Sequence, residues 1–225
     1  MITSAHNPKL RLMRRLLSSR RQREREGLFV CEGEDLLESA REAGIEPVDV
    51  LVAGEDVAGE LLAEISTLGH PPRVVSLFRR DELPRGTRDV MLALWRVADP
   101  GNVGTLLRAA DAFGAGIALS AGCADVTGPR ALRASAGAVF RVSVTRFGEI
   151  EGRLVALDAH AGTPLTELDL TPPIVFILGA EREGLPDLDD AERATIQLPG
   201  DAESLNVAMA GAIALYEVAR RRRSE

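Results

Sequence analysis

Four continuous apolar runs in the second half of the chain constrain its fold most strongly. They lie at residues 90–97, 116–120, 153–157 and 174–178. A strand that is apolar at nearly every position must be covered on both faces, as happens in a parallel sheet flanked by helices. The sequence therefore predicts an α/β fold with a mainly parallel sheet in this half.

The first 85 residues show a smaller α/β pattern. An amphipathic helix with Leu10, Met13, Leu16 and Leu17 on one side is expected to run until Gly27 ends it. Short apolar strands at 28–31, 47–52 and 73–77 then alternate with helices at 36–43 and 60–68.

A polar segment at residues 81–87 contains Pro84 and Gly86 and is typical of a linker. Strands separated by helices on both sides of it favour two α/β units rather than one. We therefore expect two domains, residues 1–85 and residues 86–225.

Positive charge is concentrated at the start of the chain. The whole chain has a net charge of −7, whereas residues 1–25 alone carry +7 and the remainder carries −14. A basic segment on an acidic body is compatible with binding to phosphates, and residues 220–223 add a second basic cluster. A solvated helix face explains the same charges, so both interpretations stay open.

The composition of the chain also bears on disulfides, metal sites and membrane segments. Cys31 and Cys123 are far apart and belong to no Cys/His cluster, so we expect neither a disulfide framework nor a metal site. No run approaches the length of about 20 apolar residues that a membrane span needs, and the N-terminus lacks the apolar core of a signal peptide. We therefore expect a cytoplasmic protein without membrane contact. The three histidines show no partner pattern and are expected at the surface or in packing roles.

The block DPGNVGTLLRAADAFGA at residues 99–115 joins a polar turn to an amphipathic helix. Proline and glycine favour the turn, and Asn102 is a natural N-cap for a helix over 103–113. Arg108 falls outside the apolar stripe and is free to face a cleft. The stripe itself consists of Leu106, Ala109, Ala110 and Phe113.

Two further blocks place polar residues where strands end. One is IVFILGAEREGLP at 174–186, and the other runs from 196 through 207 into the last helix. In this order, the three blocks resemble the three motifs of the SpoU branch of the SPOUT RNA methyltransferases, the TrmH family. Residues 2–16 and 27–40 resemble the N-terminal substrate-binding domain of the ribosomal RNA members, whose fold is similar to that of a small ribosomal protein. Residues 131–144 resemble a further family segment.

This resemblance implies an enzyme that uses S-adenosylmethionine to methylate ribose 2′-hydroxyl groups of RNA. It also implies a SPOUT domain with a C-terminal trefoil knot, and a homodimer. Ribosomal RNA, the 23S molecule first, is favoured because a full domain precedes the knot. The alternatives are a transfer RNA ribose methyltransferase, a resistance methylase and a non-catalytic RNA-binding or ribosome-assembly protein. A dinucleotide-binding oxidoreductase is disfavoured because no GxGxxG follows the first strand of either unit.

The resemblance also assigns residues. Asn102 and Arg108 match motif one, Glu181 matches motif two, and Ser204 and Asn206 match motif three; all five are catalytic candidates. The cofactor contacts fall on Gly179, Leu198 and Leu205. Arg108 is either a base assisted by an RNA phosphate or a cation that stabilises the developing alkoxide, and the second role is easier physically because guanidinium groups stay protonated. Structural roles stay open too: Ser204 as cap of the last helix, and Glu181 in an ion pair.

The last helix is expected to bury one apolar side and to pack on a partner subunit. That side comprises Leu205, Ala208, Met209, Ala212, Ile213, Tyr216 and Ala219.

Overall fold

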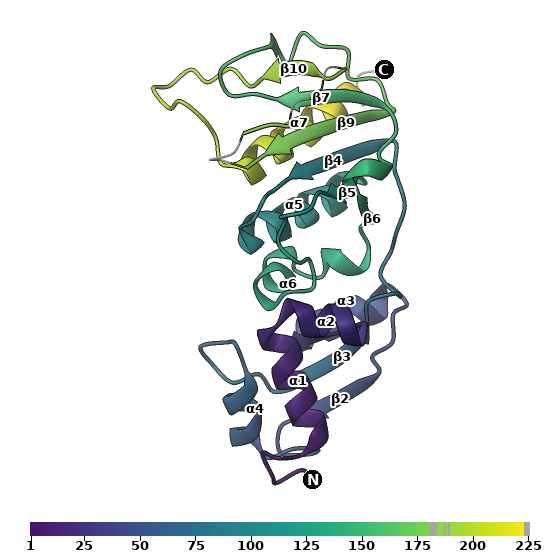
Figure 1. The fold of residues 1–225 in the computed structure, drawn as a ribbon, viewed down its shortest axis with the longest axis vertical. Helices are drawn as coiled ribbons and strands as arrows, with labels where there is room; N and C mark the ends of the chain where they lie inside the picture. The colour runs from purple at the N-terminus through teal and green to yellow at the C-terminus, as the bar shows by residue number, and fades with distance from the viewer. Residues whose placement is uncertain (181–183, 187, 189, 223–225) are drawn as a thin grey trace.

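The computed structural model describes residues 1–180, 184–186, 188 and 190–222. Two sheets follow one another along the longest axis of the molecule (Figure 1). We call the described residues up to 85 the N-terminal part and those from 86 to 222 the C-terminal part. Each part has its own sheet, with three strands in the first and seven in the second. The expected α/β class is therefore confirmed.

The N-terminal part surrounds a small antiparallel sheet in the order β1-β3-β2. Its elements are α1 (Pro8–Ser18), α2 (Arg20–Glu26), β1 (Leu28–Glu32), α3 (Glu34–Glu42), β2 (Asp49–Val52), α4 (Gly59–Ile65) and β3 (Val74–Arg79). The four apolar residues predicted to face inward from the first helix are all buried in α1.

The predicted single helix up to Gly27 is wrong in one respect, because it breaks at Ser19. The backbone of Ser19 is extended, with φ −137° and ψ 116°, and its side chain accepts a hydrogen bond from the amide of Gln22. Serine favours this capping geometry over continuation of a helix. Two helices therefore replace one, and Gly27 ends the second of them.

The C-terminal part contains a seven-stranded sheet in the order β6-β5-β4-β9-β7-β10-β8. Its elements are β4 (Val90–Trp95), α5 (Pro100–Phe113), β5 (Gly116–Leu119), α6 (Pro129–Ser135), the short 3₁₀ helices η1 (Ala138–Phe140) and η2 (Phe147–Glu149), β6 (Val144–Arg146), β7 (Arg153–Leu157), β8 (Thr163–Pro164), β9 (Ile174–Gly179), β10 (Glu192–Thr195) and α7 (Val207–Arg222). Every pair of neighbouring strands is parallel, as the continuous apolar runs predict.

The centre of this sheet is covered on both faces. Leu92 and Leu94 of β4 belong to the large core that also contains Leu106 of α5, whereas Met91 and Ala93 belong to a second cluster. Alternate residues of one strand therefore serve two cores, because successive strand side chains point to opposite faces. This arrangement explains why β4 is apolar at every position.

Within the single chain, the predicted apolar side of the last helix is only partly buried. Ala208 is buried as expected, but Met209 is 57% exposed, Ile213 37% and Tyr216 56%. The face that packs inward is instead formed by Val207, Ala208, Gly211, Ala214, Leu215, Glu217 and Val218. Among the helices of the described residues, none has the length and apolar character of a membrane span.

Candidate functional site

Helix α5 begins one turn earlier than its predicted cap. Asp99 is the N-cap, and its carboxylate accepts a hydrogen bond of 2.9 Å from the amide of Asn102. Pro100 occupies the first helical position, where a missing N–H costs nothing. The predicted cap role of Asn102 is therefore wrong, and its side chain is available for another contact.

That contact is with Asn206, at the start of the last helix. Nδ2 of Asn206 donates to Oδ1 of Asn102 over 3.0 Å, so the first and third motifs meet across 104 residues. Oδ1 of Asn206 also accepts from the amide of Ala208 at 2.9 Å. Asn206, rather than Ser204, is therefore the side chain that caps the first turn of α7.

Arg108 lies on the outer side of α5. Leu106, Leu107 and Ala110 are buried, while Arg108 is exposed as predicted. Phe113 is 37% exposed, so its predicted place in the core is wrong. Among the described residues, no hydrogen bond or ion pair of the exposed Arg108 side chain is found, so its donors can meet a ligand.

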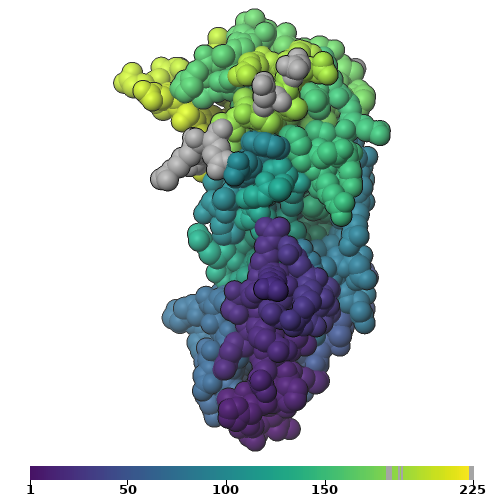
Figure 2. Space-filling model, viewed as in Figure 1, coloured from purple at the N-terminus to yellow at the C-terminus, as the bar shows by residue number. Residues whose placement is uncertain are grey.

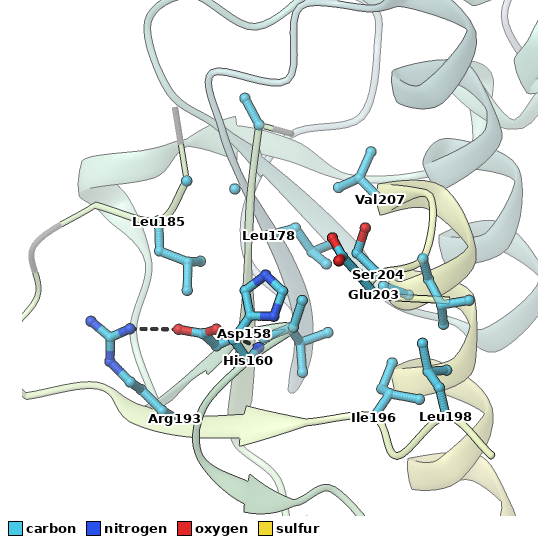
Figure 3. Close-up of a pocket in the computed structure, with 17 residues that line it drawn as sticks. Asp158, His160, Leu178, Leu185, Arg193, Ile196, Leu198, Glu203, Ser204 and Val207 are labelled. Carbon is cyan, nitrogen blue, oxygen red and sulfur yellow. Dashed lines mark hydrogen bonds and ion pairs between the residues drawn. The ribbon is translucent and has the colours of Figure 1, made fainter. Parts of the chain in front are cut away.

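A cavity of about 350 Å³ opens between the segments that follow β7, β9 and β10 (Figure 3). Gly179, Leu198, Ser204 and Leu205 line it, which brings together four of the predicted site residues. Asn102, Arg108 and Asn206 are not in its lining, although Asn206 directly follows the lining segment 203–205. Glu181 lies outside the described residues.

Gly179 lies where the chain passes close to itself. A Cβ atom at this position would lie 2.3 Å from the carbonyl oxygen of Gly184. That distance is far below any van der Waals contact, and the obstacle is backbone, which cannot rotate away. The end of β9 and the cavity-lining residue Gly184 therefore fit together only with glycine at 179.

Charged groups that the sequence analysis did not identify line the same cavity. The carboxylate of Asp158 accepts a hydrogen bond of 2.6 Å from Nη1 of Arg193 and one of 2.9 Å from the amide of His160 (Figure 3). The hydrogen bond from that amide and the guanidinium hold the pKa of Asp158 below its usual value, despite an opposing effect of burial. Glu203 and His160 also line the cavity.

The position of Asp158 in the sequence could have indicated its place on the cavity wall. Asp158 follows the predicted strand 153–157, and the carboxyl ends of parallel strands are where ligands bind in open α/β sheets. His160 is exposed, as predicted, but its place on the cavity wall was missed. Among the described residues, no three His, Cys, Asp or Glu side chains are grouped as metal ligands would be.

Known proteins share this architecture. Residues 89–216 match the sequence model of the SpoU rRNA Methylase family. The chain is 34% identical to an uncharacterized tRNA/rRNA methyltransferase of Synechocystis, over 97% of this chain and 93% of that protein. It is 31% identical to a 23S rRNA uridine 2′-O-methyltransferase of Streptomyces viridochromogenes, over 97% and 92%.

A solved structure agrees with the fold. The AdoMet-bound rRNA methyltransferase of Sinorhizobium meliloti superimposes with a TM-score of 0.86 and 28% identity, covering 98% of this chain and 97% of that one. The match extends over both sheets, and the family match covers the strands and helices that surround the cavity. The chain therefore belongs to the SpoU rRNA methylase family.

Proposed function

We propose that this protein transfers a methyl group from S-adenosylmethionine to a ribose 2′-hydroxyl of RNA, with ribosomal RNA as its substrate. One observation carries the proposal. Ser204 and Leu205 line the cavity, and the next residue, Asn206, is bonded to Asn102 on the helix that carries Arg108. A single short segment thus joins a cofactor-sized pocket to the helix with the exposed arginine.

The cavity suits the proposed cofactor. Its volume of about 350 Å³ falls within the range of small-molecule sites. Leu178, Ile196 and Leu198 offer apolar walls for an adenine ring, and the carboxylates of Asp158 and Glu203 can accept hydrogen bonds from hydroxyl and ammonium groups. When bound, S-adenosylmethionine supplies a methyl group on a positively charged sulfur.

Arg108 is the proposed catalytic residue. Methylation requires a ribose oxygen that is held in line with the methyl group and that loses its proton. A guanidinium group stabilises the negative charge that develops on this oxygen and binds a neighbouring RNA phosphate through paired hydrogen bonds. We favour this role over that of a base, because guanidinium stays protonated in proteins. The proton of the 2′-hydroxyl would then pass to water or to the neighbouring RNA phosphate, and S-adenosylhomocysteine would be the other product.

Neutral side chains position these groups. Asn102 and Asn206 fix each other, and both carry amide groups that can orient the ribose without adding charge. Ser204, exposed at the cavity, offers a hydroxyl beside them. For Glu181 we propose a partner role toward the asparagines or nearby backbone amides, and for Gly179, Leu198 and Leu205 cofactor contact.

We propose that the N-terminal part binds the RNA. Arg11, Arg15 and Arg21 are exposed, and within the described residues no ion pair neutralises them. They belong to α1 and α2, which form the front of the lower half of the molecule (Figure 2). Binding through such charges weakens steeply with salt. Since ribosomal RNA is the proposed substrate, we place the enzyme in the cytoplasm.

We further propose a homodimer and a knotted C-terminal segment. Met209, Ile213 and Tyr216 recur at helical spacing and form an exposed apolar face on α7, which a second copy would cover. The knot is supported by the course of the chain. After β9, the next strand of the chain is β10, which lies on the far side of β7 in the sheet. The chain then returns, so that α7 packs against α5.

Calorimetry and nucleoside analysis test the proposed function. We expect S-adenosylhomocysteine to bind to the purified protein and NAD to show no binding. With S-adenosylmethionine and 23S ribosomal RNA, we expect 2′-O-methylated nucleosides that are absent without enzyme. Binding of NAD alone, or cofactor binding without methylation of ribosomal or transfer RNA, would count against it.

A further inference from the structure

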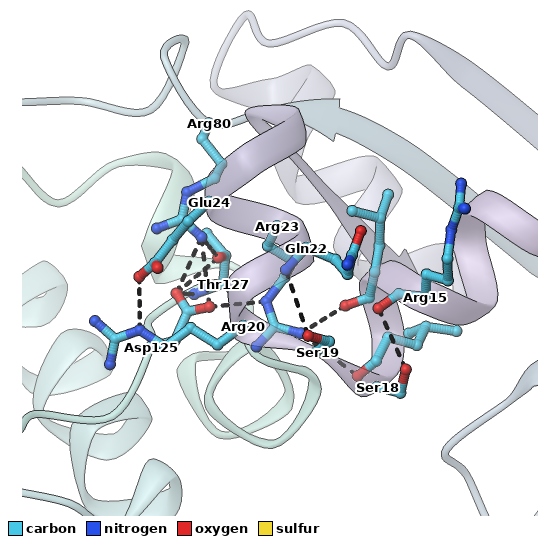
Figure 4. Close-up of polar contacts among 12 residues, drawn as sticks. Arg15, Ser18, Ser19, Arg20, Gln22, Arg23, Glu24, Arg80, Asp125 and Thr127 are labelled. Carbon is cyan, nitrogen blue, oxygen red and sulfur yellow. Dashed lines mark hydrogen bonds and ion pairs between the residues drawn. The ribbon is translucent and has the colours of Figure 1, made fainter.

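Buried charges lie between the N-terminal and C-terminal parts (Figure 4). Asp125, in the loop before α6, has a side chain that is only 5% exposed. Its Oδ2 accepts from Nε of Arg23 at 2.7 Å, and its Oδ1 accepts from Arg80 at 3.1 Å. Both arginines belong to the N-terminal part, so one carboxylate receives two cations from across the interface.

All members of this cluster are satisfied. Arg23 also donates to the carbonyl oxygen of Leu16 at 2.5 Å, which fixes its guanidinium against the end of α1. The amide and the hydroxyl of Thr127 donate to Asp125 at 3.0 and 2.8 Å, and Arg80 also donates to that hydroxyl. A buried ion pair contributes little net stability, but breaking it is costly, so its geometry tolerates few alternatives.

In a second buried ion pair, the carboxylate belongs to the N-terminal part and the arginine to the C-terminal part. Glu32 of β1, with a side chain 3% exposed, lies 3.7 Å from Arg133 of α6. The hydroxyl of Ser66 and the amide of Thr67 donate to Glu32 at 2.7 and 2.8 Å. Arg133 also donates to the hydroxyl of Thr67 at 2.9 Å. Arginines of each part therefore pair with a buried carboxylate of the other part.

Apolar contacts surround these pairs. The ring of Phe140 lies 6.2 Å from that of Phe29 and 5.2 Å from that of Phe78, and all three side chains are fully buried. The expected linker also contacts the C-terminal part, because the amide of Val144 donates a hydrogen bond of 3.1 Å to the carbonyl oxygen of Pro84. Interfaces between domains allow motion unless they are large and apolar, and this one shares a core.

The interface is connected to the site through α6. Arg130, five residues after Asp125, lies 3.7 Å from Asp99, the cap of α5. Helices α5 and α6 touch closely, since a Cβ on Gly104 would lie 2.4 Å from the carbonyl oxygen of Ala131. A shift of the N-terminal part against Asp125 would therefore act on the helix that carries Asn102.

From this geometry we infer that Asp125 is a positioning residue, which locks the two parts into one rigid body and holds the RNA-binding face at a fixed distance and direction from Arg108. The inference rests on the proposed function. Methyl transfer is sensitive to alignment, and a misplacement of about 1 Å can cost a hundredfold in rate. A rigid connection allows RNA bound to α1 and α2 to present one ribose to the site.

Distances between the two parts test directly whether Asp125 holds them in one arrangement. Cys31 and Cys123 are buried, so spin labels on Glu60→Cys and Glu151→Cys, both exposed positions, would report the separation of the parts. In labelled protein assembled with an excess of unlabelled chain, so that only one copy of the proposed dimer carries labels, we expect one narrow distance distribution for the otherwise wild-type sequence. Asp125→Asn should broaden it, whereas Asp169→Asn, at an exposed carboxylate paired within the C-terminal part, should not.

Activity supplies the second readout. With purified 23S ribosomal RNA, Asp125→Asn should lower kcat/KM about tenfold or more, while its affinity for S-adenosylhomocysteine stays within about twofold, because the cavity is untouched. Thr127→Val removes one hydrogen bond to Asp125 and keeps both ion pairs, so it should act in the same direction more weakly. It replaces Asp125→Asn if that variant fails to fold.

Two outcomes would overturn the inference. They are an unchanged distribution in the folded variant, whatever its activity, and a broadened distribution with unchanged kcat/KM. Failure of the proposed function is separate. It would appear as a wild-type protein that methylates no RNA, and the distance measurement does not depend on it.

Discussion

The side chain of Asn206 donates a hydrogen bond of 3.0 Å to Asn102 and at the same time caps α7 through its other amide atom. The two functions use different atoms, so they can be separated by substitution. Asn206→Asp keeps an acceptor for the amide of Ala208 but loses the donor toward Asn102. Asn206→Ala loses both.

We therefore expect Asn206→Asp to reduce methyl transfer with little change in the free energy of unfolding. Asn206→Ala should lower that free energy by about 1 kcal/mol, the usual cost of a lost N-cap, and also reduce activity. Denaturant unfolding and an RNA methylation assay measure the two effects. Equal activity of Asn206→Asp and wild type would show that the bond to Asn102 has no catalytic role.

Gly179→Ala should damage cofactor binding. The added Cβ would lie 2.3 Å from a backbone oxygen of Gly184, so the loop that lines the cavity must move. Overpacking of this kind costs about 1–3 kcal/mol, and about 1.4 kcal/mol is a factor of ten in affinity. Calorimetry with S-adenosylhomocysteine should show that loss. Gly200→Ala, where a Cβ meets nothing within 4 Å, is the matched control and should bind normally.

Glu217 should make stability depend on acid pH. Hydrogen bonds from Arg220 lower its pKa from 4.5 to about 2, against an opposing effect of burial, and Arg221 adds to the shift. Arg221 in turn donates to the carbonyl oxygen of Thr166 at 2.7 Å, which ties α7 to the loop after β8. Because the folded-state pKa is depressed, the stabilisation is complete above pH 4.5 and disappears as the pH falls through about 2.

The expected result is a difference that depends on pH. Glu217→Gln should be less stable than wild type at neutral pH, and the gap should close between pH 4.5 and about 2. Urea unfolding at several pH values measures it. Other carboxylates with lowered pKa values titrate equally in both proteins, so the comparison isolates Glu217. A gap that stays constant down to pH 2 would contradict the assignment.

The apolar face of α7 should hold a dimer together. Met209 and Tyr216 are 57% and 56% exposed, and Met209→Asp with Tyr216→Asp would place two charges in the proposed interface. We expect a dimer for the wild type and a monomer for the double variant by light scattering at micromolar concentration. Val48→Asp, at an exposed apolar residue of the N-terminal part, should leave the dimer intact. A monomeric wild type would refute the interface.

Local periodicity predicted much of this fold. The apolar runs of the C-terminal part are strands of a parallel sheet, and the four inward residues of α1 are buried, because these patterns follow from the geometry of single elements. Caps were less predictable. Asp99 and Asn102 both suit the start of α5, and only the position of Asn206 decides which side chain is free.

Contacts between distant segments could not be predicted. The spacing of Met209, Ile213 and Tyr216 indicates an apolar face, but it cannot distinguish packing within the chain from packing on a second copy. The pairing of Arg23 with Asp125 joins residues 102 positions apart, and no local pattern marks it. For the site itself, the candidate residues came from the family resemblance, because periodicity alone does not single them out.

Methyl transfer by Arg108→Ala measures whether this arginine takes part in catalysis. The variant removes an exposed side chain from α5, so the fold and the affinity for S-adenosylhomocysteine should persist. Arg146→Ala, at another exposed arginine of the same part, is the control. We would measure 2′-O-methylated nucleosides formed in 23S ribosomal RNA by mass spectrometry. We expect a loss of orders of magnitude for Arg108→Ala and near-normal activity for Arg146→Ala, whereas normal turnover of Arg108→Ala would exclude a catalytic role for this side chain.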